Sequence, residues 1–151
     1  MKDSFMKEAL KQAQKAYAIE EIPVGCVIVK DNKIIAKGYN KKETTNNPCG
    51  HAEIVTIQKA CKKISDWRLE NCEMYITLEP CMMCVGAIIQ SRIKKVYIGT
   101  LDKKTGAVIS KIDVNNQYIV NHKFEYEVGI LEDECSNILK DFFRILRKGK
   151  V

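Results

Sequence analysis

Two short segments carry the side chains that could do chemistry. The first, residues 49–53, reads CGHAE, and the second, residues 79–84, reads EPCMMC. They supply one imidazole, His51, and a closely spaced thiol pair, Cys81 and Cys84. Two thiolates and one imidazole suit a catalytic zinc ion, which takes three protein ligands and keeps a fourth position for water. The sequence therefore predicts a zinc centre with these three ligands.

A carboxylate stands two residues after the histidine. Glu53 is not needed as a ligand, and a base beside a zinc-activated water can take a proton from that water. Within a regular helix, side chains two residues apart point in different directions. The arrangement therefore requires His51 to lie at a helix cap, where it reaches zinc while Glu53 faces the substrate. We expect Glu53 to be the catalytic residue.

The alternative is a closed structural zinc site, because many C-x-x-C pairs with a distant further ligand have that role. The sequence contains no second C-x-x-C and no H-x₃₋₅-H to complete such a set. That absence favours the open, catalytic arrangement. Cys49 is the residue that could still close the site as a fourth ligand.

Helices and strands must hold these segments in place. Apolar residues at three- and four-residue spacing predict helices over residues 3–19, 52–63 and 133–148. Asp3 or Ser4 is expected to cap the first of them. Runs of β-branched and apolar residues predict strands over residues 26–29, 33–39, 72–78, 95–99 and 124–128. Another helix should carry the cysteine pair and end near Ser91, with Pro80 near its first turn.

The order of these elements predicts an α/β layered domain with helices on both faces of the sheet. Residues 26–29 and 33–39 should form a hairpin, because their connection is too short for a parallel crossover. Residues 101–123 show no clear period and are expected to be mostly loop. Sites in such sheets lie beyond the carboxyl ends of strands, which is where residues 78–81 fall. With 151 residues, we expect one domain, 1–151.

Composition narrows the class of protein. Seven cysteines, with neither a recognisable secretory leader nor an apolar run of about 20 residues, argue against a disulfide framework and a membrane protein. We expect a cytoplasmic protein whose isolated cysteines, Cys26, Cys61, Cys72 and Cys135, are small apolar core residues. The formal charge of +6 suggests an acidic partner, with RNA or DNA as candidates.

The motifs resemble those of a known family. His51-x-Glu53 followed by Pro80-Cys81-x-x-Cys84 is shared by the whole cytidine deaminase-like superfamily of zinc enzymes. The DKKTGA stretch that begins at Asp102 and the DFFR end at residues 141–144 select one branch. On these motifs the chain resembles the bacterial tRNA-specific adenosine deaminases, which make inosine at the wobble position. The resemblance covers nearly the whole chain.

The resemblance implies a three-layer α/β/α cytidine deaminase-like fold with a five-stranded mixed sheet. It also implies one zinc ion per subunit and a homodimer that acts on tRNA. Asn40 would help hold the target nucleotide, with Pro23 and Val24 lining the base pocket and Ala52 among the substrate-binding residues. Asp102 would meet the RNA backbone near a ribose hydroxyl.

The basic residues give a hint about RNA contacts. The C-terminal basic group contains Arg144, Arg147, Lys148 and Lys150. It differs from other basic clusters because Phe142 and Phe143 accompany it. One ring should face the core, while the other could stack on a loop base as the arginines meet phosphates. We therefore expect Lys104, Phe142 and Arg144 among the contacts to the anticodon stem-loop.

The reaction implied is the hydrolytic deamination of adenosine. Glu53 would take a proton from the attacking water and pass it to N1 of the adenine, and ammonia would leave after attack at C6. Two alternatives stay open. A small-molecule deaminase acting on guanine or cytosine shares the zinc motif, and substrate competition separates it. A non-catalytic RNA-binding zinc module is the other, and ammonia release separates that one.

Overall fold

The computed structural model of the chain describes residues 1–118 and 120–149. Five strands form one sheet: β1 (Gly25–Lys30), β2 (Lys33–Tyr39), β3 (Cys72–Leu78), β4 (Lys95–Thr100) and β5 (Glu125–Val128). The helices are α1 (Lys2–Ala18), α2 (Ala52–Ile64), α3 (Met82–Gln90), the short 3₁₀ helix η1 (Val114–Asn116) and α4 (Glu132–Lys148). Within the described residues, no helix combines the length and the apolar character that crossing a membrane requires.

The sheet is mixed, as expected. Its order is β2-β1-β3-β4-β5, and β1 runs antiparallel to both of its neighbours while β3, β4 and β5 are parallel. The predicted hairpin is confirmed. Its two turn residues, Asp31 and Asn32, both have positive φ (51° and 61°), and turns of this hand match the twist of the flanking strands. All strands except β1 therefore end at the same edge of the sheet.

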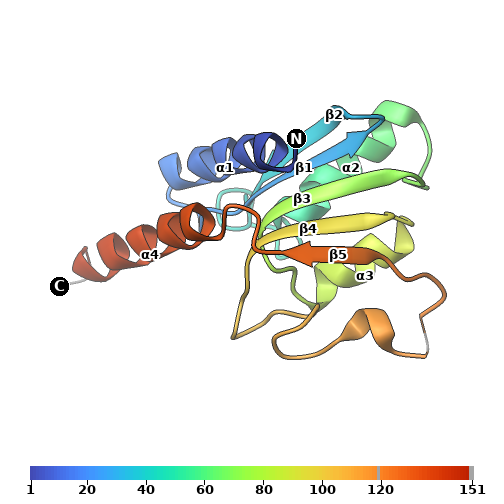
Figure 1. Ribbon diagram of the computed structural model, residues 1–151. Coiled ribbons are helices and arrows are strands. Elements are labelled where there is room, and N and C mark those ends of the chain that lie inside the picture. The colour runs from blue at the N-terminus through green and yellow to red at the C-terminus, as the bar shows by residue number, and fades with distance from the viewer. Residues whose placement is uncertain (119, 150–151) are drawn as a thin grey trace.

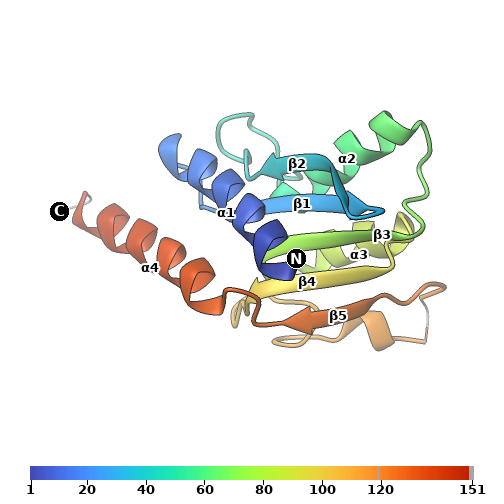
Figure 2. The ribbon, with the colours of Figure 1, turned by 45° about the horizontal axis from the view of Figure 1, so that its top comes forward.

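Helices cover both faces of the sheet, which confirms the three-layer fold (Figure 1). Successive residues of β1 point to opposite faces of the sheet. Cys26 and Ile28 pack in the core with α2 and α3, whereas Val27 and Val29 pack with α1. The first part of α4 shares the α1 face, and the rest of α4 extends beyond the sheet (Figure 2).

Some local expectations need correction. α1 begins at Lys2 with Met1 as its N-cap, so neither Asp3 nor Ser4 caps it. Asp3 instead lies in the first turn, where its negative charge interacts favourably with the positive end of the helix dipole. The described part of residues 101–123 is mostly loop around η1, as predicted.

The isolated cysteines behave as expected with one exception. All seven cysteines are free thiols. Cys26, Cys72 and Cys135 have fully buried side chains, which confirms their place in the core. Cys61 is only partly buried and packs against the margin of that core.

Candidate functional site

Two helix starts bring the predicted ligands together. His51 is the N-cap of α2, with extended backbone (φ −71°, ψ 154°), and Cys81 is the N-cap of α3 (φ −76°, ψ 175°). The Nδ1 atom of His51 lies 3.6 Å from the Sγ atoms of both Cys81 and Cys84. The prediction that His51 occupies a cap is confirmed.

These distances test whether the cluster fits zinc. Zn–S bonds of about 2.3 Å and Zn–N bonds of about 2.0–2.1 Å in a tetrahedron place the nitrogen and a sulfur about 3.5–3.6 Å apart. The observed separations agree with that spacing, and all three ligand atoms lie within 4.8 Å of one another. The residues present therefore fit a zinc ion held by one imidazole and two thiolates.

The two cysteine thiols differ in pKa. A hydrogen bond from the Cys84 thiol, aided by His51, lowers the pKa of Cys81 to about 4. The same hydrogen bond, together with burial, raises the pKa of Cys84. One sulfur of the pair thus favours the thiolate form that metal binding needs.

Cys49 lies apart from this cluster. Its side chain is exposed, and its backbone N–H donates to Oδ1 of Asn47 at 2.9 Å. Among the described residues, the metal-compatible group contains His51, Cys81 and Cys84 and leaves Cys49 out. The arrangement supports three protein ligands rather than four.

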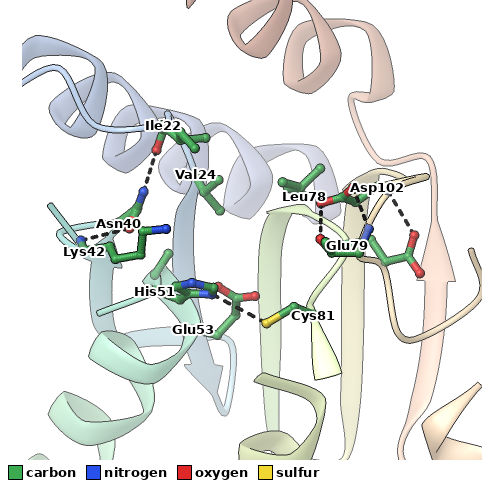
Figure 3. A pocket seen from close by; sticks show the side chains of 12 residues that line it. Ile22, Val24, Asn40, Lys42, His51, Glu53, Leu78, Glu79, Cys81 and Asp102 are labelled. Atoms are coloured by element: carbon green, nitrogen blue, oxygen red, sulfur yellow. Dashed lines mark hydrogen bonds between the residues drawn. The ribbon is translucent and has the colours of Figure 1, made fainter. Parts of the chain in front are cut away.

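Glu53 lies in the first turn of α2 and is 4% exposed. Figure 3 shows its carboxylate beside His51 and Cys81, on the floor of a pocket. Burial raises the pKa of Glu53 to about 7. A buried carboxylate next to the ligand cluster is placed to exchange protons with a molecule held there.

The pocket has a volume of about 320 Å³ and opens at the carboxyl ends of β2, β3 and β4. Of the residues expected around the substrate, the lining includes Val24, Asn40, Ala52 and Asp102. Pro23 is buried and is not among the lining residues. The sequence interpretation assigned no place in the pocket wall to Ile22, Lys42, Leu78, Glu79 and Thr105, which also line the pocket. Their signal was their position, because each stands within three residues of a predicted site residue.

Asn40 connects two parts of the pocket wall. It is 7% exposed, and its amide donates to the carbonyl of Ile22 at 3.2 Å while its oxygen accepts from the N–H of Lys42 at 3.1 Å. Figure 3 shows these residues on one side of the ligand cluster, opposite Glu79 and Asp102. One hydrogen of the Asn40 amide remains for a ligand.

Two buried carboxylates hold the loops around the pocket, and sequence reasoning missed both. Glu21, 1% exposed, accepts from the N–H groups of Glu43 and Thr44 and from the Thr44 hydroxyl. Glu79, 2% exposed, does the same for residues 101–110, named here the 101–110 loop. Both carboxylates accept mainly from backbone N–H groups, which every residue except proline has. The side-chain sequence therefore does not show which residues they bind.

A second hollow of about 380 Å³, named here the α4 groove, lies between α4 and the start of the 101–110 loop. Its lining residues are Thr100, Leu101, Lys104, Ser136, Leu139, Lys140, Phe143 and Arg147. It combines three positive charges with an aromatic ring that is 37% exposed, Phe143. The pocket lining and the groove lining meet in the 101–110 loop.

The C-terminal expectations are only partly met. Phe142 is 8% exposed and packs edge-on against Tyr17, with 5.5 Å between the ring centroids. It is the core-facing ring, so Phe143 is the one available for stacking. Arg144 is exposed but pairs with Asp141 and does not line the α4 groove. Lys150 lies outside the described residues.

Comparisons with known proteins all identify deaminases. The family model for MafB19-like deaminases matches residues 1–147. The chain is 44% identical to the tRNA-specific adenosine deaminase of Bacillus subtilis (strain 168), over 97% of this chain and 91% of that protein. It is 43% identical to the protein of the same name from Aquifex aeolicus (strain VF5), over 98% of this chain and 97% of that protein.

The solved structures that match this chain include deaminases of more than one substrate class. A protein from work on A-to-I editing by tRNA:A34 deaminases at the wobble position superposes with a TM-score of 0.88 at 38% identity, covering 90% of this chain and 99% of that one. A guanine deaminase from Bacillus subtilis superposes with a TM-score of 0.62 at 42% identity, covering 65% of this chain and 63% of that one.

Proposed function

Since this chain belongs to the family of bacterial tRNA-specific adenosine deaminases, we propose that it converts adenosine to inosine at the wobble position of a tRNA anticodon. The His51–Cys81–Cys84 cluster, with buried Glu53 beside it in the pocket, supports the deamination, and the similarity to the tRNA-specific relatives supports the substrate. We propose further that residues 1–151 act as one catalytic domain.

Metal binding and proton transfer fall to different side chains. His51, Cys81 and Cys84 would hold one zinc ion, which when bound supplies an acidified water as the nucleophile for hydrolysis. Glu53 takes a proton from that water and returns it to N1 of the adenine ring. Its burial keeps competing solvent away from both transfers. Once the oxygen of the water has bonded to C6, Glu53 moves the proton of the new hydroxyl group to the exocyclic amine, the C6–N bond breaks, and ammonia leaves inosine behind.

The pocket suits a single extruded base. Its volume of about 320 Å³ is at the small end of the range for ligand sites. Val24 and Leu78 offer apolar wall, and Asn40 offers an amide hydrogen. Asp102, at the rim, is placed to meet the ribose or backbone of the same nucleotide. An anticodon loop yields such a base at low cost because its bases are already unpaired.

Ammonia release from matched substrates tests this proposal. An anticodon stem-loop with adenosine at the wobble position should release one ammonia per loop, while free adenosine and guanine should be poor substrates. A preference for guanine would make the chain a small-molecule deaminase. If no substrate releases ammonia, the proposal of a catalytic site fails in favour of an RNA-binding zinc module.

We expect the α4 groove to bind the phosphates of the stem-loop. Replacing Lys140 and Arg147 together by alanine should weaken stem-loop binding and flatten its salt dependence by a slope of about 1.5, since each lost phosphate contact removes about 0.7–0.9. Affinity across a salt series measures this. The control is Lys62→Ala with Lys63→Ala, an equal charge change on exposed residues in the last turn of α2. Equal slopes for both variants would exclude the groove as the phosphate site.

A homodimer is part of the same proposal. Apolar side chains stand exposed on α3 and in the loop between β4 and η1: Met82 (66%), Ile109 (46%) and Ile112 (42%). A Cβ atom at Gly86 on α3 would meet nothing within 4 Å, so another chain could approach closely there. We expect Met82→Glu to shift the mass measured by light scattering from dimer to monomer. An unchanged mass would place the dimer interface elsewhere.

We also propose a cytoplasmic location. The seven cysteines are all free thiols, and a reducing compartment maintains that state. The proposed substrate, tRNA, is consistent with the same compartment.

A further inference from the structure

The Glu79 side chain is saturated with hydrogen bonds from the 101–110 loop. Its Oε2 atom accepts from the backbone N–H groups of Val108, Ile109 and Ser110 at 3.1, 2.8 and 3.0 Å. Its Oε1 atom accepts from the N–H of Asp102 at 3.0 Å and from the Ser110 hydroxyl. Five donors from one loop thus converge on a carboxylate that is 2% exposed.

The loop is packed tightly around that carboxylate. A Cβ atom added at Gly106 would lie 2.3 Å from Cδ of Glu79, so only glycine lets the chain pass there. The backbone adds two links of its own: Glu79 N–H donates to the Thr100 carbonyl, and Ala107 N–H donates to the Pro80 carbonyl, both at 2.9 Å. These hydrogen bonds fix the position of the loop relative to residues 79 and 80, which lead directly into Cys81.

This anchoring matters because the front of the loop has little else to hold it. Leu101 and residues 103–105 are exposed, and fully buried apolar side chains follow only at Ala107 and Val108. Asp102 is fixed from within the loop, since its carboxylate accepts from Lys104 N–H and from the N–H and hydroxyl of Thr105. The contact of Glu79 with Asp102 N–H connects this exposed turn to the buried anchor (Figure 3).

We propose that Glu79 is a positioning residue: its buried carboxylate holds Asp102 and Thr105 at a fixed place relative to the zinc ligands, so that the pocket rim is formed before tRNA binds. The inference rests on the proposed function, because it assigns the rim to the target nucleotide. Glu79 lines the pocket, but loop donors occupy both of its carboxylate oxygens, so its effect on the substrate passes through Asp102.

The test uses Glu79→Gln in the zinc-loaded enzyme. An amide can keep one oxygen toward the three N–H groups of residues 108–110, but it then turns an NH₂ group toward Asp102 N–H, where two donors face each other. We expect KM for the anticodon stem-loop to rise roughly 10- to 100-fold with kcat within about threefold and zinc content unchanged. Ser110→Ala, which removes one donor and no charge, should raise KM in the same direction by a smaller factor.

Two controls separate positioning from loss of stability. Asn115 is 4% exposed and exchanges two hydrogen bonds with the Phe124 backbone, so Asn115→Asp should destabilise the fold without raising KM. In an Asp102→Ala background, Glu79→Gln should add little to the KM effect, because residues acting through one contact are not additive. Fully additive effects, or an unchanged KM in both the Glu79 and Ser110 variants, would overturn the proposal.

Amide hydrogen exchange tests the anchoring of the loop without any measurement of activity. Exchange at residues 102–110 should speed up in Glu79→Gln and stay unchanged in Asn115→Asp, while exchange in α2 stays slow in both. If the wild-type enzyme fails to deaminate the stem-loop, the proposed function fails, and this exchange pattern still decides whether Glu79 holds the rim. Unchanged exchange at residues 102–110 would show that it does not.

Discussion

Glu53→Ala should keep one zinc ion per chain and lose deamination by about 10⁴-fold or more. The side chain takes no part in the ligand cluster, which consists of His51, Cys81 and Cys84. It is instead the carboxylate that both removes the proton from the attacking water and delivers it to the ring nitrogen, and each such transfer contributes about 10²- to 10⁴-fold. Elemental analysis for zinc and inosine released by digestion of the RNA measure both properties on one sample.

A matched control is available in the same chain. Glu70 is an exposed carboxylate near the start of β3, at the opposite end of that strand from the pocket. Glu70→Gln should retain zinc and full activity. Glu53→Gln should be as inactive as Glu53→Ala, because the amide fills the space but cannot carry the proton. An active Glu53 variant would remove this residue from the mechanism.

The second large effect concerns the metal. Cys81→Ala and Cys84→Ala should each lose zinc and activity together, because two remaining protein ligands do not retain the ion under dialysis. Cys84 is fully buried, so its replacement also leaves a small cavity, and Cys84→Ser offers a closer match in size. Zinc content after dialysis and the ammonia release rate are the two measurements.

Cys49→Ala is the control for the ligand variants, since it removes a thiol two residues from His51. Cys49 is exposed and lies outside the ligand cluster, so zinc and activity should both be retained. Loss of zinc from Cys49→Ala would mean that the loop closes a site of three cysteines and one histidine. The open position that hydrolysis requires would then not exist.

The metal site was readable from the sequence because its chemistry depends on side-chain type and spacing. Cys81 and Cys84 stand one helical turn apart, and the pairing of His51 with Glu53 makes sense only at a helix start, where the structure places it. The strands were equally clear, because consecutive residues such as Val27 and Ile28 pack on opposite faces of the sheet, and burial of both faces gives a continuous apolar run.

What could not be predicted depends on backbone partners and on contacts distant in sequence. Glu79 appears in the sequence as one more acidic residue beside a motif, since its five donors come mostly from main-chain N–H groups 23 to 31 residues later. Adjacent phenylalanines give no sign of which one is buried. Tyr17, 125 positions earlier than Phe142, decides that by packing against its ring.

Sequencing a tRNA pool before and after incubation with the zinc-loaded protein tests the central claim most directly. Inosine is read as guanosine, so deamination appears as an A-to-G change. We predict such changes at the wobble position of tRNAs that carry adenosine there, with none in a parallel reaction using Glu53→Ala. A pool unchanged by the active, zinc-loaded protein, or changes spread over adenosines outside the anticodon, would contradict the account.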